Sequence, residues 1–138
     1  MECIQLNPIG HIRSPFKEIH QIPPQSIYAK DKKAIIKIKD QYKEGLRDLD
    51  KLSYIEIIFY FHKSENFELI TKTPWSKEKK GVFSTRSPKR PNPIGISIVK
   101  LLEIGEDEII VEGVDMLDGT PVLDIKPYNS NLNPDELK

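Results

Sequence analysis

The sequence has a single cysteine and no long apolar run, and each absence excludes a class of protein. With Cys3 alone, the chain cannot form an internal disulfide or a zinc site built from several cysteines. No apolar stretch approaches the ~18–20 residues that a membrane-spanning helix needs. Residues 1–14 also lack the basic region and apolar stretch of a secretory signal. These features predict a cytoplasmic protein.

Common nucleotide-binding and metal-binding patterns are missing as well. The chain contains neither a GxGxxG nor a Walker sequence and shows no alternation of strands and helices, so we expect no Rossmann domain. His11, His20 and His62 lack the spacing of metal ligands, and we predict no metal site. The formal net charge is zero, from 21 Lys or Arg and 21 Asp or Glu, so overall charge does not indicate a nucleic-acid binder.

The composition and patterning of the sequence fit one small β-rich domain. It shows no internal repeat and no low-complexity linker, so residues 1–138 are expected to form a single domain. Short apolar stretches with turn signals between them favour a mainly β fold. We therefore predict a single antiparallel β-barrel-like domain with one or two short helices.

Hydrophobic alternation, β-branched side chains and turn-forming residues locate the expected elements. Residues 41–50 are the best helical stretch, which Gly45 weakens, and we expect loops at 22–26 and 72–80 and a proline-rich turn at 86–95. We expect strands at residues 4–13 (an edge strand with a bend), 33–39, 54–61 (a buried central strand), 81–85, 96–104, 109–115 and 120–126, and a turn at 118–120.

Zero net charge conceals an uneven distribution of charge along the chain. Residues 72–100 carry eight Lys or Arg against Glu78 alone, whereas residues 101–125 carry eight Asp or Glu and no Lys or Arg. One interpretation is that both are solvated faces whose fields offset each other. The other is a basic surface for a phosphate-rich partner beside an acidic pocket for a cationic ligand.

Residues 81–97 (GVFSTRSPKRPNPIGIS) combine cations with rigidity. Arg86 and Arg90 present fork-shaped donors that suit a carboxylate or a phosphate. The three prolines at 88, 91 and 93 reduce backbone freedom before folding, so the turn is held stiff at low entropic cost. The segment is therefore either a binding loop or a proline-rich surface turn whose arginines pair with nearby acids.

The segment RSPKRPNPIGIS (86–97) closely resembles the signature of the TsaA/TrmO-like family. Three further stretches resemble that family: IGHIRSPFKE (9–18), Phe61–His62 at a strand end, and DGTPVLDIKPY (118–128). The resemblance covers roughly residues 4–128. Two departures are minor: Ser84, just before the quoted segment, stands where the family usually has Ala, and Ile96 stands where it usually has Leu. The strand at 54–58 also lacks the Trp that is often seen there. The chain also ends about ten residues after IKPY, where longer members continue into an additional C-terminal domain.

The resemblance implies a small β-barrel methyltransferase that uses S-adenosylmethionine and works as a homodimer, with its sites near the subunit interface. It further implies N6-methylation of threonylcarbamoyl-adenosine beside the tRNA anticodon. Three alternatives stay open. The first two are a module that binds S-adenosylmethionine or a nucleoside, and a methyltransferase acting on a different small substrate. A structural or interaction domain is the third.

The cofactor carries a carboxylate, an ammonium and a sulfonium, and the family segments offer a partner for each. Arg86 suits the carboxylate, while Asp115 and Asp118 suit the ammonium, the ribose hydroxyls or the sulfonium. Adenine would be met by apolar or main-chain atoms. The predicted cofactor-binding residues are Pro24, Gln25, Ser26, Phe61, His62, Arg86, Asp115, Met116, Leu117, Asp118 and Gly119.

Methyl transfer is an in-line displacement, so positioning supplies most of the catalysis. The amide-like N6 is a poor nucleophile until its proton leaves, and a base would assist. Asp118 and Tyr128 are the first catalytic candidates, with His62 and Lys126 behind them. The residues expected to bind the RNA substrate are Lys89, Arg90 and Lys126, together with Lys77, Lys79 and Lys80.

Each of these residues also has a purely structural interpretation. His62 suits a strand-end histidine that bonds to main chain, and Trp75 either stacks on a base or covers a core edge. Asp124 and Lys126 suit a structural ion pair, and Tyr128 suits packing at an interface.

Overall fold

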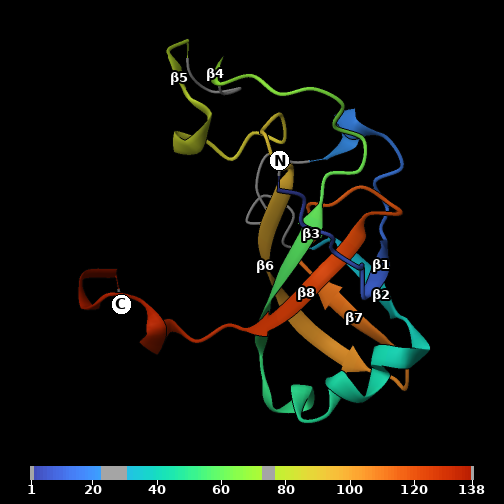
Figure 1. The fold of residues 1–138 in the computed structure, drawn as a ribbon. Helices are drawn as coiled ribbons and strands as arrows, with labels where there is room; N and C mark the ends of the chain where they lie inside the picture. The colour runs from blue at the N-terminus through green and yellow to red at the C-terminus, as the bar shows by residue number, and fades with distance from the viewer. Residues whose placement is uncertain (1, 23–30, 73–76, 138) are drawn as a thin grey trace.

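A closed six-stranded antiparallel barrel forms the body of the molecule (Figure 1). The computed structural model describes residues 2–22, 31–72 and 77–137. Around the barrel the strands run in the order β1-β2-β7-β6-β3-β8, and β1 closes it by pairing with both β2 and β8. The barrel strands are β1 (Gly10–Arg13), β2 (Lys33–Ile38), β3 (Tyr54–Tyr60), β6 (Ile94–Ile104), β7 (Glu108–Glu112) and β8 (Pro121–Pro127).

The barrel interior is filled by β-branched side chains that alternate along the strands. Since successive residues of a strand point to opposite faces, every second residue of β2 and β3 enters the core. Isoleucine and valine suit these positions because they pack well on a pleated surface. The core includes Ile36, Ile55, Ile57, Val99, Ile109, Val111 and Val122, each at most 1% exposed. The predicted mainly β antiparallel barrel is confirmed.

The helical segments in the described part of the chain are all short 3₁₀ turns. The helix expected at 41–50 is present as η3 (Asp40–Leu46) followed by η4 (Leu49–Lys51), with Leu46 buried against the barrel. In the described residues no helix has the length and apolar character needed to cross a membrane. The other turns are η1 (Ile19–Gln21), η5 (Val82–Ser84), η6 (Ser130–Leu132) and η7 (Asp135–Leu137).

Several expected strands differ from the structure because pairing, which is non-local, sets their limits. An edge strand over 4–13 is wrong: only Gly10–Arg13 forms a strand, and closure of the barrel gives it a neighbour on each side. The strand over 109–115 ends at Glu112, since Gly113 turns the chain with a φ of +92°. β3 is central, as expected, but only one of its faces is buried.

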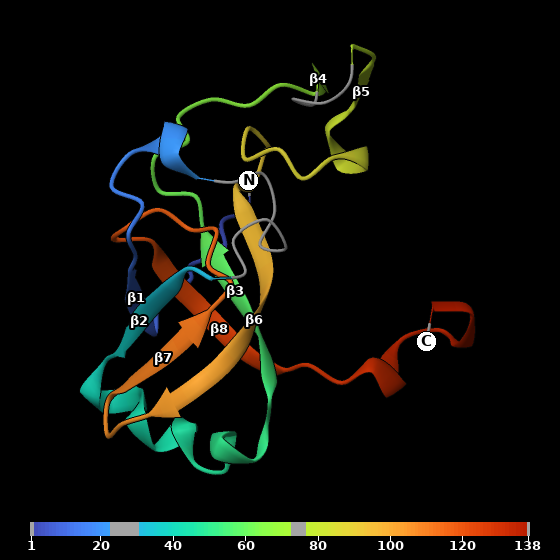
Figure 2. The same ribbon diagram turned by 180° about the vertical axis from the view of Figure 1, so that it is seen from behind.

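A two-stranded hairpin stands apart from the barrel, where the sequence predicted a loop and then a strand. β4 (Ile70–Lys72) pairs with β5 (Lys79–Gly81), and the hairpin projects away from the barrel in both views (Figures 1 and 2). The strand expected at 81–85 is wrong, because Val82–Ser84 forms η5 instead. β5 (Lys-Lys-Gly) carries little strand propensity and β4 has only three residues, so their mutual pairing is what reveals them.

Candidate functional site at one end of the barrel

Several loops meet at one end of the barrel, which we call the loop end: residues 14–18, 61–64, 86–93 and 113–120. The backbone N–H of Phe61 donates to the Pro93 carbonyl oxygen at 2.8 Å, which joins the second loop to the third. The N–H of Asp118 donates to the Phe16 oxygen at 2.7 Å, which joins the first to the fourth. The proline-rich turn and the aspartate-rich turn thus lie at the same end of the barrel, and their predicted closure around one ligand stays a prediction.

Asp118 braces this end of the barrel with both carboxylate oxygens. Oδ1 accepts a hydrogen bond from the Ser14 N–H at 2.9 Å, and Oδ2 lies 3.0 Å from Lys17 Nζ. Burial by itself would raise the pKa of Asp118, but the Lys17 and Ser14 hydrogen bonds and the nearby charges of Lys17 and Arg13 lower that pKa below its usual value. The carboxylate is therefore a weak base, and its geometry favours holding the loop over accepting a proton.

Residues 115–117 lie at the loop end between β7 and β8 and are held there by hydrogen bonds and burial. Asp115 Oδ1 accepts a hydrogen bond from the buried Ser97 hydroxyl at 2.8 Å. Met116 and Leu117 are both buried, main chain included. Within the described ranges no residue accepts a hydrogen bond from the Met116 or Leu117 N–H. Two buried donors without partners suit the ring nitrogens of a bound purine.

Phe61 and His62 approach the aspartate-rich turn from the end of β3. The Phe61 ring contacts Phe59 edge-on, with ring centroids 5.0 Å apart. Gly95 lies against both rings, and a Cβ there would come within 2.8 Å of each, so the close approach requires glycine. A Cβ on Gly119 would lie 3.9 Å from His62 Nε2, which places this imidazole beside the turn.

The environment of His62 favours its neutral form. Partial burial lowers the pKa of the imidazole, and the positive charge of Lys63 lowers it further. No main-chain group in the described part of the chain bonds to its side chain, so the strand-end interpretation finds no support there. The described residues also contain no group of three His, Cys, Asp or Glu side chains arranged to hold a metal ion.

The two signature arginines have different surroundings. Arg90 Nη1 donates to the carbonyl oxygens of Thr85 at 2.9 Å and Ser87 at 3.1 Å, so this side chain braces its own turn. Arg86 is exposed, and no side chain or carbonyl of the described residues bonds to its guanidinium. In the described residues neither arginine pairs with an acidic side chain, contrary to the interpretation of a surface turn whose arginines pair with acids. Arg86 keeps its planar donors available for an anion.

An open hollow of about 650 Å³ lies beside the aspartate-rich turn. Its size matches the range of ~300–1,000 Å³ that small-molecule sites occupy. Of the residues that line it, only Leu117 was predicted from the sequence, although Lys17 and Glu18 fall in the segment that resembles the family. The hollow is lined by Lys17, Glu18, Ile19, His20, Lys63 and Leu117.

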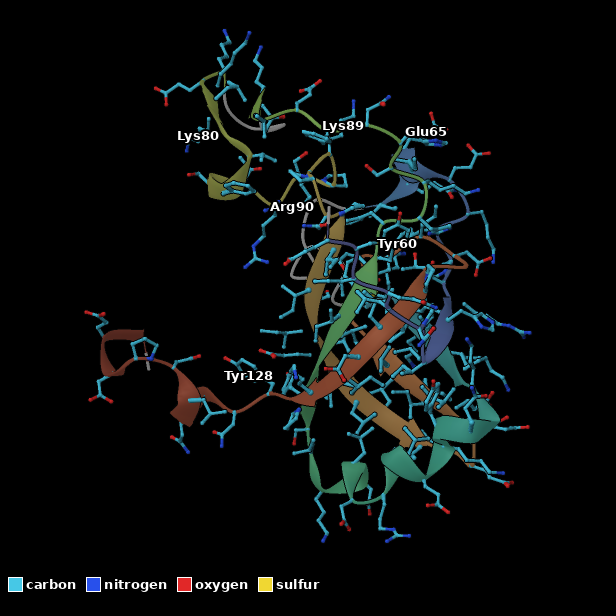
Figure 3. All side chains as sticks on the ribbon, in the orientation of Figure 1. Tyr60, Glu65, Lys80, Lys89, Arg90 and Tyr128 are labelled. Atoms are coloured by element: carbon cyan, nitrogen blue, oxygen red, sulfur yellow. The ribbon has the colours of Figure 1, made fainter. Side chains whose placement is uncertain are left out.

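Two predicted site residues lie at the opposite end of β8 from Asp118. Lys126 Nζ forms an ion pair with Asp124 Oδ2 at 3.0 Å, which confirms the expected structural pair. Tyr128 follows β8 and accepts a hydrogen bond from the Asn133 amide at 3.5 Å (Figure 3). Because a strand rises ~3.3 Å per residue, β8 separates Asp118 from Tyr128 by about 20 Å. Pro24, Gln25, Ser26 and Trp75 lie outside the described residues.

Comparisons with known proteins match nearly the whole chain. Residues 11–133 fit the sequence model of a family described as the tRNA-methyltransferase O N-terminal domain. A probable S-adenosyl-L-methionine-binding protein of Pyrococcus abyssi is 46% identical over 121 residues. The mouse tRNA (adenine(37)-N6)-methyltransferase is 40% identical over 128 residues. A solved structure of TrmO from Pseudomonas aeruginosa superposes with a TM-score of 0.81 at 35% identity.

These relatives differ in how far they extend beyond the matched region. The Pyrococcus match covers 88% of this chain and 66% of that protein, and the mouse match covers 88% and 30%. The Pseudomonas structure covers 96% of this chain, which spans 59% of the solved one. The chain thus spans at most about two thirds of these three proteins.

Proposed function

The chain belongs to the tRNA-methyltransferase O N-terminal domain family, and from that premise we propose that it is an S-adenosylmethionine-dependent methyltransferase acting on tRNA. The acceptor we propose is N6 of the adenosine beside the anticodon, carrying a threonylcarbamoyl group. The observation that carries the proposal is that both signature turns are held at the same end of the barrel, beside an open hollow. The names of the Pyrococcus and mouse relatives support the cofactor and the reaction.

The residues at the loop end fit the cofactor group by group. The unpaired guanidinium of Arg86 would hold the cofactor carboxylate. Asp115, together with Asp118 and Gly119 in the same turn, would accept hydrogen bonds from the ammonium or the ribose hydroxyls. The N–H groups of Met116 and Leu117 would donate to the adenine ring, with Phe61 and His62 beside it. When bound, S-adenosylmethionine supplies an electrophilic methyl group.

The chain's own contribution to the reaction is mainly positional. Lys17, Ser14 and Asp118 fix the turn on which the reacting groups rest, so Asp118 acts as a positioning residue. N6 would have to lose a proton when it accepts the methyl group that S-adenosylmethionine would supply. His62 is neutral and stands beside the turn, so we assign proton acceptance to it ahead of Asp118.

We further propose that the protein works as a homodimer in the cytoplasm, with the site near the subunit interface. The outward face of β3 and β6 carries adjacent apolar side chains: exposed Tyr60 opposite exposed Ile94, and half-buried Ile58 opposite exposed Ile96. An apolar patch of this kind commonly marks a protein contact. A partner seated there would also allow Tyr128 and Lys126 to reach the other subunit's loop end. Within one chain they stand too far away.

Lys89 and Arg90 remain the proposed contacts of the signature turn with the RNA backbone. Lys89 is exposed, and Arg90 places its turn while presenting part of its guanidinium to solvent. They lie three and four residues after Arg86 in the same turn, so RNA held by them would lie near the cofactor.

A second function has its own support: a module that binds S-adenosylmethionine without transferring its methyl group. The name of the Pyrococcus relative states binding only, and the weakly basic Asp118 carboxylate is already occupied by Lys17 and Ser14. This module would bind the cofactor yet leave every tRNA unchanged.

Mass spectrometry of tRNA nucleosides distinguishes the two functions. Purified protein is incubated with S-adenosylmethionine and with tRNA that carries threonylcarbamoyl-adenosine, and the N6-methylated nucleoside is quantified. We expect methylation by the wild type and its loss in Arg86→Ala. Arg47→Ala, an exposed arginine at the other end of the barrel, is the matched control and should retain activity. Cofactor binding with no methylated product would support the binding module instead.

A further inference from the structure

A structured arm extends from the loop end, and apart from Arg86 it contributes nothing to the proposed cofactor site. We call residues 64–72 and 77–90 the basic arm; it contains β4, β5 and η5 and stands clear of the barrel (Figures 1 and 2). Its two halves run alongside each other and are joined by hydrogen bonds along their length. The Ser64 hydroxyl donates to the Pro88 oxygen at 3.0 Å, and the Val82 N–H donates to the Leu69 oxygen at 2.8 Å.

The arm has an interior of its own, which makes it a formed element. Val82 is 1% exposed and Thr71 is 7% exposed, although both lie outside the barrel core. The Thr85 hydroxyl donates to the Val82 oxygen at 2.8 Å and closes the turn after β5. Side chains on the outside of the arm are therefore presented at fixed positions.

The outside of the arm is strongly basic. Its sequence carries seven Lys or Arg against three Glu in a chain of zero net charge, so the positive charge is concentrated here. Lys72 and Lys79 are directly opposite each other in the hairpin, an arrangement of like charges that destabilises a strand pair. Within the described residues no acidic side chain pairs with either of them. Figure 3 shows Lys80 and Lys89 among the arm's side chains.

Two aromatic rings stand among these cations in solvent. Phe83, in η5, is 79% exposed, and Phe67, before β4, is 55% exposed. A free ring face next to several cations is the combination that binds unpaired nucleotides, because the cations hold phosphates while the ring stacks on a base. Paired RNA hides its base faces and cannot use the rings.

We propose that the basic arm binds the unpaired loop of a structured RNA, with bases stacked on Phe83 and Phe67 and phosphates held by Lys72, Lys79 and Lys80. The inference rests on the proposed function and deepens it, since it states where the RNA lies. Because the arm begins at the loop end, an RNA loop held there presents a neighbouring base to the cofactor site. Phe83 is a base-stacking residue in this arrangement and is not part of the cofactor site.

The test measures binding of a fluorescent RNA stem-loop that has an unpaired loop, with a blunt duplex of the same composition as comparison. We expect the wild type to prefer the stem-loop. Phe83→Ala should weaken stem-loop binding by about 5- to 100-fold, the range for loss of one stacked base, without changing duplex binding. Phe83→Tyr keeps the ring and should restore binding.

The charge contribution is measured by the dependence of affinity on salt. In Lys72→Gln/Lys79→Gln the slope of log affinity against log salt should fall by ~0.7 for each lost contact to a single strand. Phe83→Ala should leave that slope unchanged. The matched control is Lys39→Gln/Lys51→Gln, which removes two exposed lysines at the other end of the barrel and should change neither slope nor affinity.

Three results would overturn the inference. Equal weakening of stem-loop and duplex by Phe83→Ala would mean that no stacking occurs. Conversion of a dimer to a monomer by Phe83→Ala, seen by light scattering, would show that the ring contacts a second copy. Failure of the wild type to bind the stem-loop would reject the arm as the RNA site. Separate calorimetry with S-adenosylmethionine keeps this last failure distinct from failure of the proposed function.

Discussion

The loop end and the basic arm are neighbours, yet they are held by different kinds of contact. At the loop end, hydrogen bonds join residues far apart in the chain, such as Ser14 to Asp118 and Ser97 to Asp115. In the arm, the contacts join residues 64–72 to residues 79–90 and do not involve the barrel core. A site that must position a small cofactor needs the first kind of support, while a surface that follows an RNA needs reach and charge.

The largest expected difference between the two regions comes from adding a single carbon. Gly95→Ala at the loop end would place Cβ against the Phe59 and Phe61 rings, so we expect a loss of about 1–3 kcal/mol of stability from overpacking. Gly81→Ala, in the arm, has open space around its Cβ and should change stability little. Urea denaturation of both variants checks this. Equal effects would mean that the loop end is no more tightly packed than the arm.

The next effect tests the ion pair between Asp118 and Lys17 at the loop end. Asp118→Asn removes the charge that pairs with the half-exposed Lys17, and we expect a stability loss of about 1 kcal/mol at neutral pH. Because the folded state lowers the pKa of Asp118, its contribution is present above the unfolded pKa of ~4 and is lost as the pH falls through the folded value. Urea denaturation of the wild type and of Asp118→Asn at a series of pH values measures this contribution to stability. A difference that persists in strong acid would contradict an ionic brace.

A smaller effect concerns the pH dependence of methyl transfer. Because burial and Lys63 lower the pKa of His62, the imidazole stays neutral at pH 7 and gains a proton only as the pH falls below its usual value of ~6.5. We expect activity to decline along that acid limb in the wild type. In His62→Gln the limb should disappear, and the maximum rate should be lower. An unchanged limb would assign the base to another group.

The smallest expected effect is at the far end of β8. Lys126→Gln breaks an ion pair whose two side chains are both at least half exposed, so the stability change should stay within about 0.5 kcal/mol. If a partner subunit brings Lys126 to the site, methyl transfer to tRNA should nevertheless fall. Activity equal to that of the wild type would remove Lys126 from the proposed RNA contacts.

The barrel was predictable where each strand carries its own signal. Strands near 33–39, 54–61, 96–104 and 120–126 alternate or contain β-branched residues, and the structure has β2, β3, β6 and β8 there. The β4–β5 hairpin was missed because Lys79 and Lys80 gain strand geometry only from pairing with Lys72 and Thr71. Closure of the barrel could not be predicted from residues 4–13. The second neighbour of β1 is β8, which begins more than a hundred residues later.

For the candidate site, the sequence indicated which segments matter but not how they are supported. The turns at 86–95 and 118–120 were expected to approach each other, and hydrogen bonds now connect both to the same end of the barrel. The engagement of Asp118 with Lys17 and Ser14 was invisible, because it joins residues about a hundred positions apart. The remoteness of Tyr128 likewise appears only once β8 is in place.

A crystal structure of the protein with S-adenosylmethionine tests the central claim most directly. The account predicts electron density for the cofactor at the loop end, with its carboxylate on Arg86 and its adenine on the main chain of Met116 and Leu117. Cofactor bound elsewhere on the barrel, or at the loop end with Arg86 turned away, would contradict it.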